Sequence, residues 1–562
     1  MKGCEKYIPF RPIELKGRRW PSNKIEKPPV WCSVDLRDGN QALVDPMNLS
    51  EKLEMFKTLC AIGVKEIEVG FPSASETEYE ILRALIDGGH IPDDVTVQVL
   101  VQAREHLIRK TFDAVEGAKN VIVHFYNSTS ALQRKVVFKK DMDGITEIAV
   151  AGAKLIKALG DEAMRKSGAN IRYEYSPESF MGTEPENAVM ICGRVLEELG
   201  ADKTHKVILN LPSTVENSTP NCFADLIEYF CDNLPGRDAT IISLHPHNDR
   251  GTAVATAELG MLAGAERIEG TLFGNGERTG NVDIITLALN MFTQAVDPGL
   301  DLSDINAIRE VYERTTKMQV GPRHPYAGEL VFTAFSGSHQ DAINKGEEYM
   351  RTSRSEYWEI PYLPINPADV GREYEPVIRI NSQSGKGGAA FIMTNTFGYK
   401  LPKAMHPEFG RVVKRYCDEV GREISADEVM NLFRQEYIDI DGPYMLTAHK
   451  FFEESGADET AVRFEGKLKN NGAEPVDISG LGNGPIDAFF NALATVGING
   501  YRFVDYSEHA ISIGSDAKAV SYIHLTSPQG KNLFGVGISH NINYASIRGV
   551  LCAINRSLVK TP

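Results

Sequence analysis

A regular alternation of short β-branched runs with helical patterns limits the fold of this chain more than any other feature. Strands alternating with helices form parallel βαβ units, and eight strands within about 265 residues are typical of a (βα)8 barrel. We therefore expect an α/β fold built on a TIM barrel, with a doubly wound parallel sheet as the alternative. The eight expected strands are Val30–Leu36, Val64–Val69, Val95–Val101, Asn120–Phe125, Ile171–Tyr175, Val207–Leu211, Thr240–Leu244 and Arg267–Leu272.

A barrel predicts that functional side chains gather where its strands end. Arg37 and Asp38 follow the first expected strand, and His245 and His247 follow the seventh. Residues at i and i+2 of an extended segment point the same way, so the two imidazoles can bind one metal ion, with Asp38 adding a carboxylate oxygen. Such a histidine pair also occurs without any metal. Asn281, at the end of a glycine-rich turn after the eighth strand, can offer an amide oxygen.

Further candidate functional side chains lie at the expected strand ends. A divalent cation with open positions binds a 2-oxo acid through its carboxylate and ketone oxygens and polarises the ketone for attack. Arg37 is placed to donate to the developing alkoxide, although an ion pair with a neighbouring carboxylate is the alternative role. For His124, the alternative to a functional role is that of a core histidine with satisfied hydrogen bonds. The further candidates at the strand ends are Leu100, His124, Tyr126, Ser176, Glu178 and Thr214.

Charge and cysteine usage exclude several classes of protein. The net charge of −16 and the pI near 5.4 argue against a nucleic-acid partner, which requires a basic surface. The eight cysteines are scattered without paired spacing, as expected for reduced thiols in a cytosolic enzyme. No leader-type segment is recognisable, and no run approaches the ~18 apolar residues that a membrane span needs. We expect a cytoplasmic enzyme without a membrane partner.

The length of 562 residues is too great for one core, and the pattern changes twice along the chain. We expect a barrel with an N-terminal extension over residues 1–300, and linker and accessory subdomains over 301–455, where 402–455 look helical. A C-terminal α+β regulatory domain is expected over 456–562. Two glycine-containing turns there, one including Gly482, Asn483 and Gly484, each precede an apolar helix, which suggests a duplicated β-β-α unit. Such glycines can cradle an anion or permit close backbone packing.

Five segments of the chain carry a family resemblance: residues 34–41, 175–179, 209–216, 245–251 and 274–281. They closely resemble the corresponding segments of the long-type 2-isopropylmalate synthases, a branch of the metal-dependent barrel superfamily of Claisen-condensing enzymes and lyases. The resemblance runs nearly end to end, and the C-terminal region resembles that family's leucine-binding regulatory domain. It implies condensation of acetyl-CoA with 3-methyl-2-oxobutanoate and water to give 2-isopropylmalate and CoA. It also implies a homodimer with leucine as effector.

The resemblance also implies a role for each matching residue. The ligands of a divalent ion (Mg²⁺, Mn²⁺ or Zn²⁺) would be Asp38, His245, His247 and Asn281, and a monovalent cation such as K⁺ is a further expected activator. Arg37 would stabilise the alkoxide, Glu178 would act as a polarising carboxylate, Leu100 would meet the branched tail of the oxo acid, and Thr214 would meet its carboxylate. The rest of the pocket would be His124, Tyr126 and Ser176.

Residues outside the barrel complete the implied site. A base must remove a proton from the acetyl methyl group, and histidine is suited to this because its pKa lies near neutral pH. The family's candidates match His339 and Tyr374, in a segment that reaches over the partner subunit's barrel in relatives. Regulation is assigned to Gly482, Asn483 and Gly484.

Two other interpretations remain open from the sequence. Homocitrate or citramalate synthases share the metal motif and differ in the oxo-acid pocket. An amino-acid-sensing scaffold with an inactive barrel belongs to a different class, and the presence of all candidate ligands and of Arg37 argues against it.

Overall fold

The structure is a computed structural model that describes residues 3–334, 336–374, 386–422, 424–438, 440, 442–455, 460–511 and 517–559. It divides into two compact units. The first comprises Met1–Phe332 with Ile365–Glu373, and the second comprises Thr333–Pro364 with Tyr374–Pro562. Among the described helices none is long and apolar enough to cross a membrane. Each unit is described by itself.

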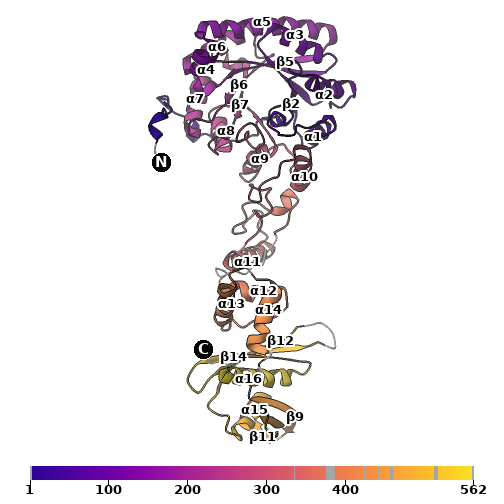
Figure 1. The fold of residues 1–562 in the computed structure, drawn as a ribbon, viewed down its shortest axis with the longest axis vertical. Coiled ribbons are helices and arrows are strands. Elements are labelled where there is room, and N and C mark those ends of the chain that lie inside the picture. The colour runs from indigo at the N-terminus through magenta and orange to yellow at the C-terminus, as the bar shows by residue number, and fades with distance from the viewer. Residues whose placement is uncertain are drawn as a thin grey trace. The chain divides into compact units, whose positions relative to one another are not determined.

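The first unit contains a closed barrel of eight parallel strands in sequential order, which confirms the TIM-barrel prediction and excludes the doubly wound sheet (Figure 1). Parallel pairing of the first strand with both the second and the eighth closes the ring. The strands are β1 Val30–Ser33, β2 Glu66–Gly70, β3 Thr96–Gln102, β4 Asn120–Ser128, β5 Asn170–Glu178, β6 Val207–Ser213, β7 Thr240–Pro246 and β8 Arg267–Gly270.

Helices surround the barrel, and local signals in the sequence fix where they begin and end. The first starts at a capping box, in which Asn48 accepts from the Glu51 amide at 3.0 Å and Glu51 accepts from the Asn48 amide at 2.8 Å. The longest ends at Gly168, whose φ of 71° suits a helix terminus. The helices are α1 Leu49–Ala61, α2 Glu76–Asp87, α3 Glu105–Ala114, α4 Ala131–Gln133, α5 Met142–Ser167, α6 Pro185–Leu199, α7 Pro220–Asn233, α8 Ala253–Leu262, α9 Ile284–Phe292 and α10 Ile305–Thr316.

The strand ends differ from the predicted ends in a way that matters for the site. β1 stops at Ser33, and residues Asp35–Gly39 form a π-helical turn that carries Arg37 and Asp38. β4, β5 and β7 run further than predicted, so Tyr126, Ser176 and His245 lie within strands rather than beyond them. Side chains held by a hydrogen-bonded ladder are fixed more firmly than those on a loop, which favours a preorganised site.

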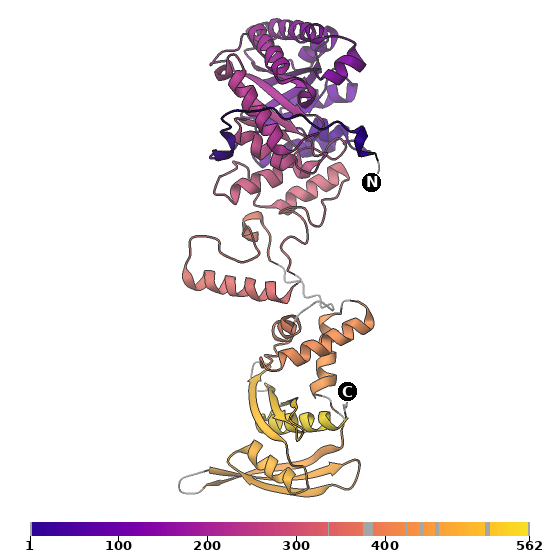
Figure 2. The ribbon, with the colours of Figure 1, turned by 90° about the vertical axis from the view of Figure 1, so that its left-hand side faces the viewer.

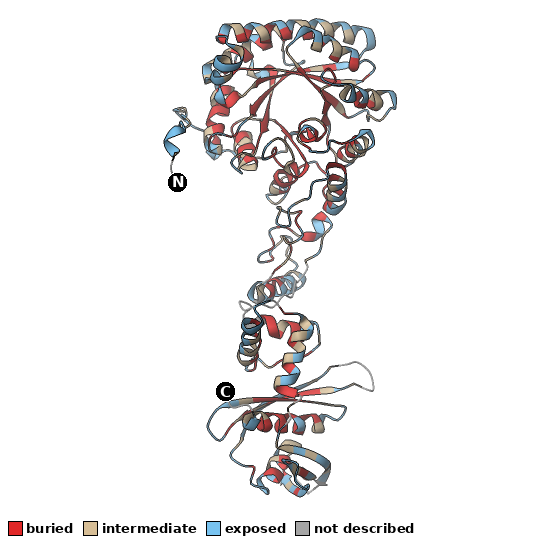
Figure 3. Cartoon of the chain, viewed as in Figure 1, coloured by how far each residue is buried: buried red, intermediate tan, exposed pale blue. Residues whose placement is uncertain are grey.

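The barrel strands are buried on both faces, as Figure 3 shows by their red colour. Apolar side chains such as Val97, Val99 and Val123 fill one face, as a strand covered by helices requires. The other face carries charge, although the interior of a TIM barrel is usually filled by branched aliphatic side chains. The buried polar side chains include Glu66, Glu68, Gln98, Glu174, Arg267 and Glu269.

The second unit combines helices with two three-stranded antiparallel sheets (Figures 1 and 2). The helices α11 Gly337–Ser353, α12 Lys386–Asn395, α13 His406–Val420 and α14 Ala426–Phe433 come first. One sheet then has the order β11-β10-β9 and precedes α15, and the other has the order β12-β13-β14 and precedes α16. These elements are β9 Tyr444–Ser455, β10 Thr460–Asn470, β11 Val476–Gly482, α15 Pro485–Ala494, β12 Arg502–Ala510, β13 Ala519–Thr526, β14 Asn532–Ser539 and α16 Ile542–Val559.

These elements revise two predictions for the C-terminal region. The expected helix over 402–455 is wrong from Tyr444 onward, because residues 444–455 form β9 and pair with β10. The repeat has three strands before each helix rather than two. The predicted domain limits at residues 300 and 455 stay predictions, and the β9–β10 pairing favours placing the second limit before Tyr444.

The glycines of the two repeats serve close packing between strand and helix. A Cβ atom on Gly482, at the end of β11, would overlap the backbone nitrogen of Ala488 in α15. A Cβ atom on Gly537 would likewise overlap the carbonyl oxygen of Ala545 in α16. The second predicted turn comprises residues 534–539, which lie inside β14, so it is in fact a strand. Close backbone packing, one of the two roles considered from the sequence, therefore accounts for both glycines.

Candidate metal centre and substrate pocket

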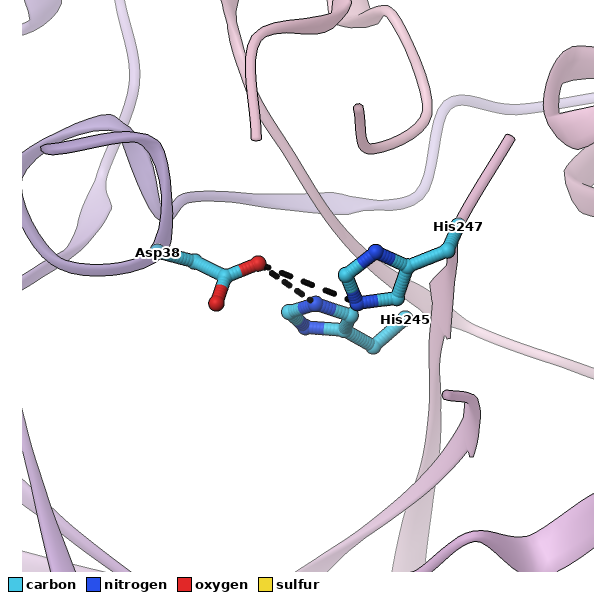
Figure 4. A group of neighbouring side chains, drawn as sticks. All are labelled: Asp38, His245 and His247. Carbon is cyan, nitrogen blue, oxygen red and sulfur yellow. Dashed lines mark ion pairs between the residues drawn. The ribbon is translucent and has the colours of Figure 1, made fainter. Parts of the chain in front are cut away.

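Asp38, His245 and His247 come together at the carboxyl ends of β1 and β7 (Figure 4). Asp38 Oδ2 lies 3.4 Å from His245 Nε2 and 3.8 Å from His247 Nε2. One ligand atom from each residue falls within 4.8 Å of the other two, and all three residues are buried. The structure thus assembles the three predicted ligands, while their role as ligands stays a prediction.

Three buried polar atoms at this cluster have no hydrogen-bond partner among the described residues: Asp38 Oδ2, His247 Nδ1 and Asn281 Oδ1. Leaving buried polar atoms unpaired is costly, so such a group calls for a ligand. Asn281 is held beside His247 by an isolated antiparallel bridge. A carboxylate, two imidazoles and an amide oxygen fit a divalent cation of hard to borderline character with positions left for substrate.

Glu269 of β8 orients His245. Its Oε2 lies 2.8 Å from His245 Nδ1, which keeps His245 Nε2 turned toward Asp38. Burial alone would lower the pKa of His245, but the nearby carboxylates of Asp38 and Glu269 raise it to about 9. Burial and the charge of His245 lower the pKa of His247 to about 3. The two imidazoles therefore have different electrostatic environments.

Glu269 gives the first prediction. Its two oxygens accept from Gln98 at 2.7 Å, Arg267 at 3.0 Å, Asn210 at 2.9 Å and His245. In a glutamine at this position, the side-chain NH₂ group would face N–H donors in place of one of these oxygens. We expect Glu269→Gln to weaken divalent-metal binding by roughly 10- to 100-fold, because the partner that fixes the ligand imidazole is lost. Titration of the metal-depleted protein with Mn²⁺ or Zn²⁺ in a calorimeter measures this.

Glu66→Gln is the matched control. Glu66 is buried in β2 and pairs with Arg267 at 2.6 Å, and among the described residues no hydrogen bond or ion pair joins it to a candidate ligand. This variant should lose stability without a matching loss of metal affinity. Equal losses of affinity in both variants would show that Glu269 acts only through the fold.

Arg37 makes two ion pairs at the pocket. Its Nη1 lies 2.6 Å from Asp38 Oδ1, and its Nε bonds to Glu68. Although burial opposes the charged form, these carboxylates raise the pKa of Arg37, and in return its charge holds the pKa of Asp38 well below the usual range. Arg37 also lines the pocket, so the ion-pair role and the predicted role toward an alkoxide are compatible.

A cavity of 350 Å³ is lined by Asp38, His245 and His247 and by every predicted pocket residue. Its polar wall includes His124, whose Nε2 lies 2.7 Å from Ser176 Oγ and whose Nδ1 lies 3.0 Å from Glu68. The hydrogen bonds of His124 are thus satisfied while its ring faces the cavity. The residues that line it are Arg37, Asp38, Gln41, Phe71, Leu100, His124, Tyr126, Ser176, Glu178, Asn210, Pro212, Thr214, His245, His247, Glu277 and Arg278.

The remaining predicted pocket residues are each held by a neighbour. Glu178 accepts from the Ser128 hydroxyl at the end of β4. Tyr126 accepts from Gln102 at 3.0 Å, and burial raises the pKa of this tyrosine.

Thr214 accepts from the Ser179 amide at 2.9 Å, which leaves its hydroxyl proton available to a ligand. Leu100, which is 8% exposed, supplies apolar surface.

The sequence interpretation did not identify a layer of buried charged residues next to the pocket. Arg267 is fully buried and contacts Glu66, Glu269 and, at 3.4 Å, Glu174. Burial raises the pKa of Glu174 well above its ordinary value, although the charge of Arg267 opposes this shift. His124, Glu174 and Glu269 also lie within ligand distance of one another, but the four bonds to Glu269 leave it no free oxygen for a second metal ion.

His339 and Tyr374 belong to the second unit. His339 is exposed on α11 and stacks on Tyr362 with ring centroids 4.0 Å apart. The Tyr374 hydroxyl is buried without a hydrogen-bond partner among the described residues, and burial raises its pKa. Their predicted role as the base stays a prediction.

The predicted regulatory residues lie at the junction of β11 and α15. Gly482 ends the strand, the Asn483 amide donates to Asp487 at 3.0 Å, and Gly484 is the N-cap of α15. A Cβ atom on Gly484 would meet open space, and its φ of −171° suits any residue. Gly482 is thus required by packing, while Gly484 is not.

Comparisons with known proteins match the three parts of the chain to three family models. Residues 28–311 match the HMGL-like family. Residues 329–394 match the alpha-isopropylmalate synthase post-catalytic domain-like family, and residues 423–558 match the LeuA allosteric (dimerisation) domain. The barrel and its donor set thus place the chain among the HMGL-like barrel proteins.

Relatives that match along their full length identify the family of this chain within the HMGL-like proteins. The chain is 55% identical to 2-isopropylmalate synthase of Clostridium acetobutylicum over 99% of both chains. It is 53% identical to that of Rhodospirillum rubrum over 98% of both chains. It is 51% identical to that of Acetoanaerobium sticklandii over 99% of this chain and 97% of the relative. The chain belongs to the 2-isopropylmalate synthase family.

Proposed function

We propose that this protein condenses acetyl-CoA with 3-methyl-2-oxobutanoate and water to give 2-isopropylmalate and CoA, under feedback inhibition by leucine. The observation that carries the proposal is the single cavity that joins the Asp38, His245 and His247 cluster to an apolar wall formed by Leu100, Phe71 and Pro212. A 2-oxo acid with a branched apolar tail matches both parts. Family membership supports the same reaction.

Each of these pocket residues has its own role in the proposed reaction. Thr214 donates to the substrate carboxylate, Leu100 meets the branched tail, and Arg37 donates to the ketone oxygen as it becomes an alkoxide. Asp38, His245, His247 and Asn281 would hold a divalent cation, which would supply Lewis-acid polarisation of the ketone. Glu178 adds a carboxylate beside the reacting groups.

The proposed reaction forms one carbon–carbon bond and cleaves one thioester bond. A base removes a proton from the acetyl methyl group, and its carbon attacks the ketone carbon while the ketone π electrons move to oxygen. The alkoxide then takes up a proton. Water cleaves the thioester, which leaves a carboxylate and the CoA thiol. We assign the base to His339, with Tyr374 as the second candidate.

The choice of oxo acid distinguishes the proposal from its nearest alternatives. We expect purified protein with acetyl-CoA and Mg²⁺ or Mn²⁺ to release CoA thiol fastest with 3-methyl-2-oxobutanoate. Pyruvate would be preferred by a citramalate synthase and 2-oxoglutarate by a homocitrate synthase. A preference for either of these acids would contradict the proposal and favour the corresponding synthase. Adding K⁺ to the same assay tests the expected monovalent activator.

Leucine inhibition gives a further prediction, at the β11–α15 junction. An effector acts through differential affinity for two states, so inhibition requires an intact effector site. We expect Gly482→Asp to keep catalysis largely intact and to abolish most of the leucine inhibition, because the new side chain must displace α15 near Ala488. Initial rates measured against leucine concentration check this.

Gly484→Ala is the matched control, two residues away in the same turn. The space around Gly484 is open, so this variant should remain inhibited by leucine. If Gly482→Asp is inhibited as strongly as the wild type, the effector site lies elsewhere. Relief in both variants would instead indicate a general loosening of the turn.

A further inference from the structure

Three loops at the mouth of the cavity converge on Thr214. They follow β5, β7 and β8, and they contribute Ser179, Asp249 and Arg278. Arg278 Nη2 donates to the Thr214 carbonyl oxygen at 2.5 Å, and the Ser179 amide donates to the Thr214 hydroxyl at 2.9 Å. The β8 loop therefore fixes the backbone of Thr214, and the β5 loop fixes its side chain.

Asp249 holds the guanidinium of Arg278 in place. Its Oδ1 accepts from Arg278 Nε at 2.7 Å, and its Oδ2 accepts from Arg278 Nη2 at 3.2 Å. The same Oδ2 accepts from the Glu216 amide at 3.0 Å, two residues beyond Thr214. Asp249 and Arg278 thus grip the segment 214–216 from both ends, in the bidentate geometry that only arginine offers.

Arg278 has a strained backbone that its contacts must stabilise. Its φ of 58° lies in the left-handed region, which non-glycine residues rarely adopt. Such a conformation persists where surrounding contacts over-determine it, and it is common at ligand sites. Arg278 also lines the cavity together with Thr214 and His247.

We infer that Arg278 is a positioning residue, which with Asp249 places the Thr214 hydroxyl against the carboxylate of the 2-oxo acid. This inference rests on the proposed function. The Arg278 and Asp249 side chains are 41% and 17% exposed. Because a partly exposed ion pair adds little to stability, the effect of breaking it should fall on substrate binding rather than on the melting temperature.

The test is Arg278→Gln. We expect the KM for 3-methyl-2-oxobutanoate to rise roughly tenfold, as for loss of one charged hydrogen bond. The KM for acetyl-CoA should change by less than about twofold, because Arg278 positions Thr214, which binds the carboxylate of the oxo acid. The dissociation constant of the oxo acid, measured by calorimetry with Mg²⁺ present, should rise in parallel. Arg278→Lys keeps the charge but lacks the planar fork, so it should restore binding only in part.

Arg237 offers a matched control. It precedes β7, at the opposite end of the barrel strands, and it also joins a carboxylate and a backbone carbonyl. Its Nη2 lies 2.9 Å from Glu266 and 3.0 Å from the Gly264 oxygen, and its side chain is 29% exposed. Arg237→Gln should leave the KM for the oxo acid unchanged.

Asp249→Asn should raise the same KM, and the double variant with Arg278→Gln should be no worse than the more affected single variant, because the two residues act as one unit. If Arg278→Gln does not fold, the comparison of Asp249→Asn with Arg237→Gln decides. An unchanged oxo-acid KM and dissociation constant in folded Arg278→Gln would overturn the inference, as would an equal rise in Arg237→Gln. A wild-type protein that binds the oxo acid but releases no CoA would overturn the proposed function alone.

Discussion

Asp38→Asn should reduce turnover by on the order of a thousandfold while the protein stays folded. The substitution replaces the charged side chain that we propose as a metal ligand with a neutral amide, and Lewis-acid polarisation is worth several kcal/mol in the transition state. It also removes the carboxylate that lies 2.6 Å from Arg37 and 3.4 Å from His245. Release of CoA thiol measured with saturating acetyl-CoA and oxo acid gives the rate.

Metal removal separates the role of the ion from that of the carboxylate. Exhaustive treatment with EDTA should abolish wild-type activity, and Mg²⁺, Mn²⁺ or Zn²⁺ should restore it. Asp38→Asn should respond poorly to the same ions. Wild-type rates that survive chelation would contradict the metal assignment, and so would a fully active Asp38→Asn protein.

Two inactive variants should rescue one another if His339 acts on the partner subunit's barrel. Asp38→Ala inactivates its own barrel but keeps His339, and His339→Ala does the reverse. In randomly mixed C2 dimers, roughly half of the molecules are hybrids with one intact site of two, so activity should approach about a quarter of the wild-type value. The match of residues 423–558 to a dimerisation domain supports the assembly that this requires.

Co-expression with two different tags allows the hybrids to be purified and subunit mixing to be demonstrated. A preparation in which both subunits carry Asp38→Ala, under the same two tags, gives the baseline. Hybrids that are no more active than this baseline would place His339 in its own subunit's site or outside catalysis.

The barrel was predictable because eight β-branched runs alternate with helical patterns, and the parallel ladder follows from that order. Asp38, His245 and His247 were predictable for the same reason, since the ends of β1 and β7 meet at one face of a barrel. Position along the strands was therefore enough to bring together residues that are about 200 apart in the sequence.

The buried charges were not predictable in this way. In the segment Lys65 to Val69, glutamates alternate with apolar residues, which usually indicates a strand with one face in water. In the closed barrel that polar face turns inward, where Glu68 meets Arg37 and His124. The contacts of Arg278 with Thr214 and Asp249 likewise depend on where three loops end in space.

Arg267 limits how this barrel can be recombined with its relatives. Its guanidinium reaches side chains of Glu66 on β2, Gln98 on β3, Glu174 on β5 and Ser243 on β7, besides Glu269 on its own strand. A chimera that exchanged half of the barrel would keep this network only where the incoming strands carry the same partners, and otherwise buried charges would be left unmatched. Inheritance of these five strands as one block is the expected rule for viable hybrids.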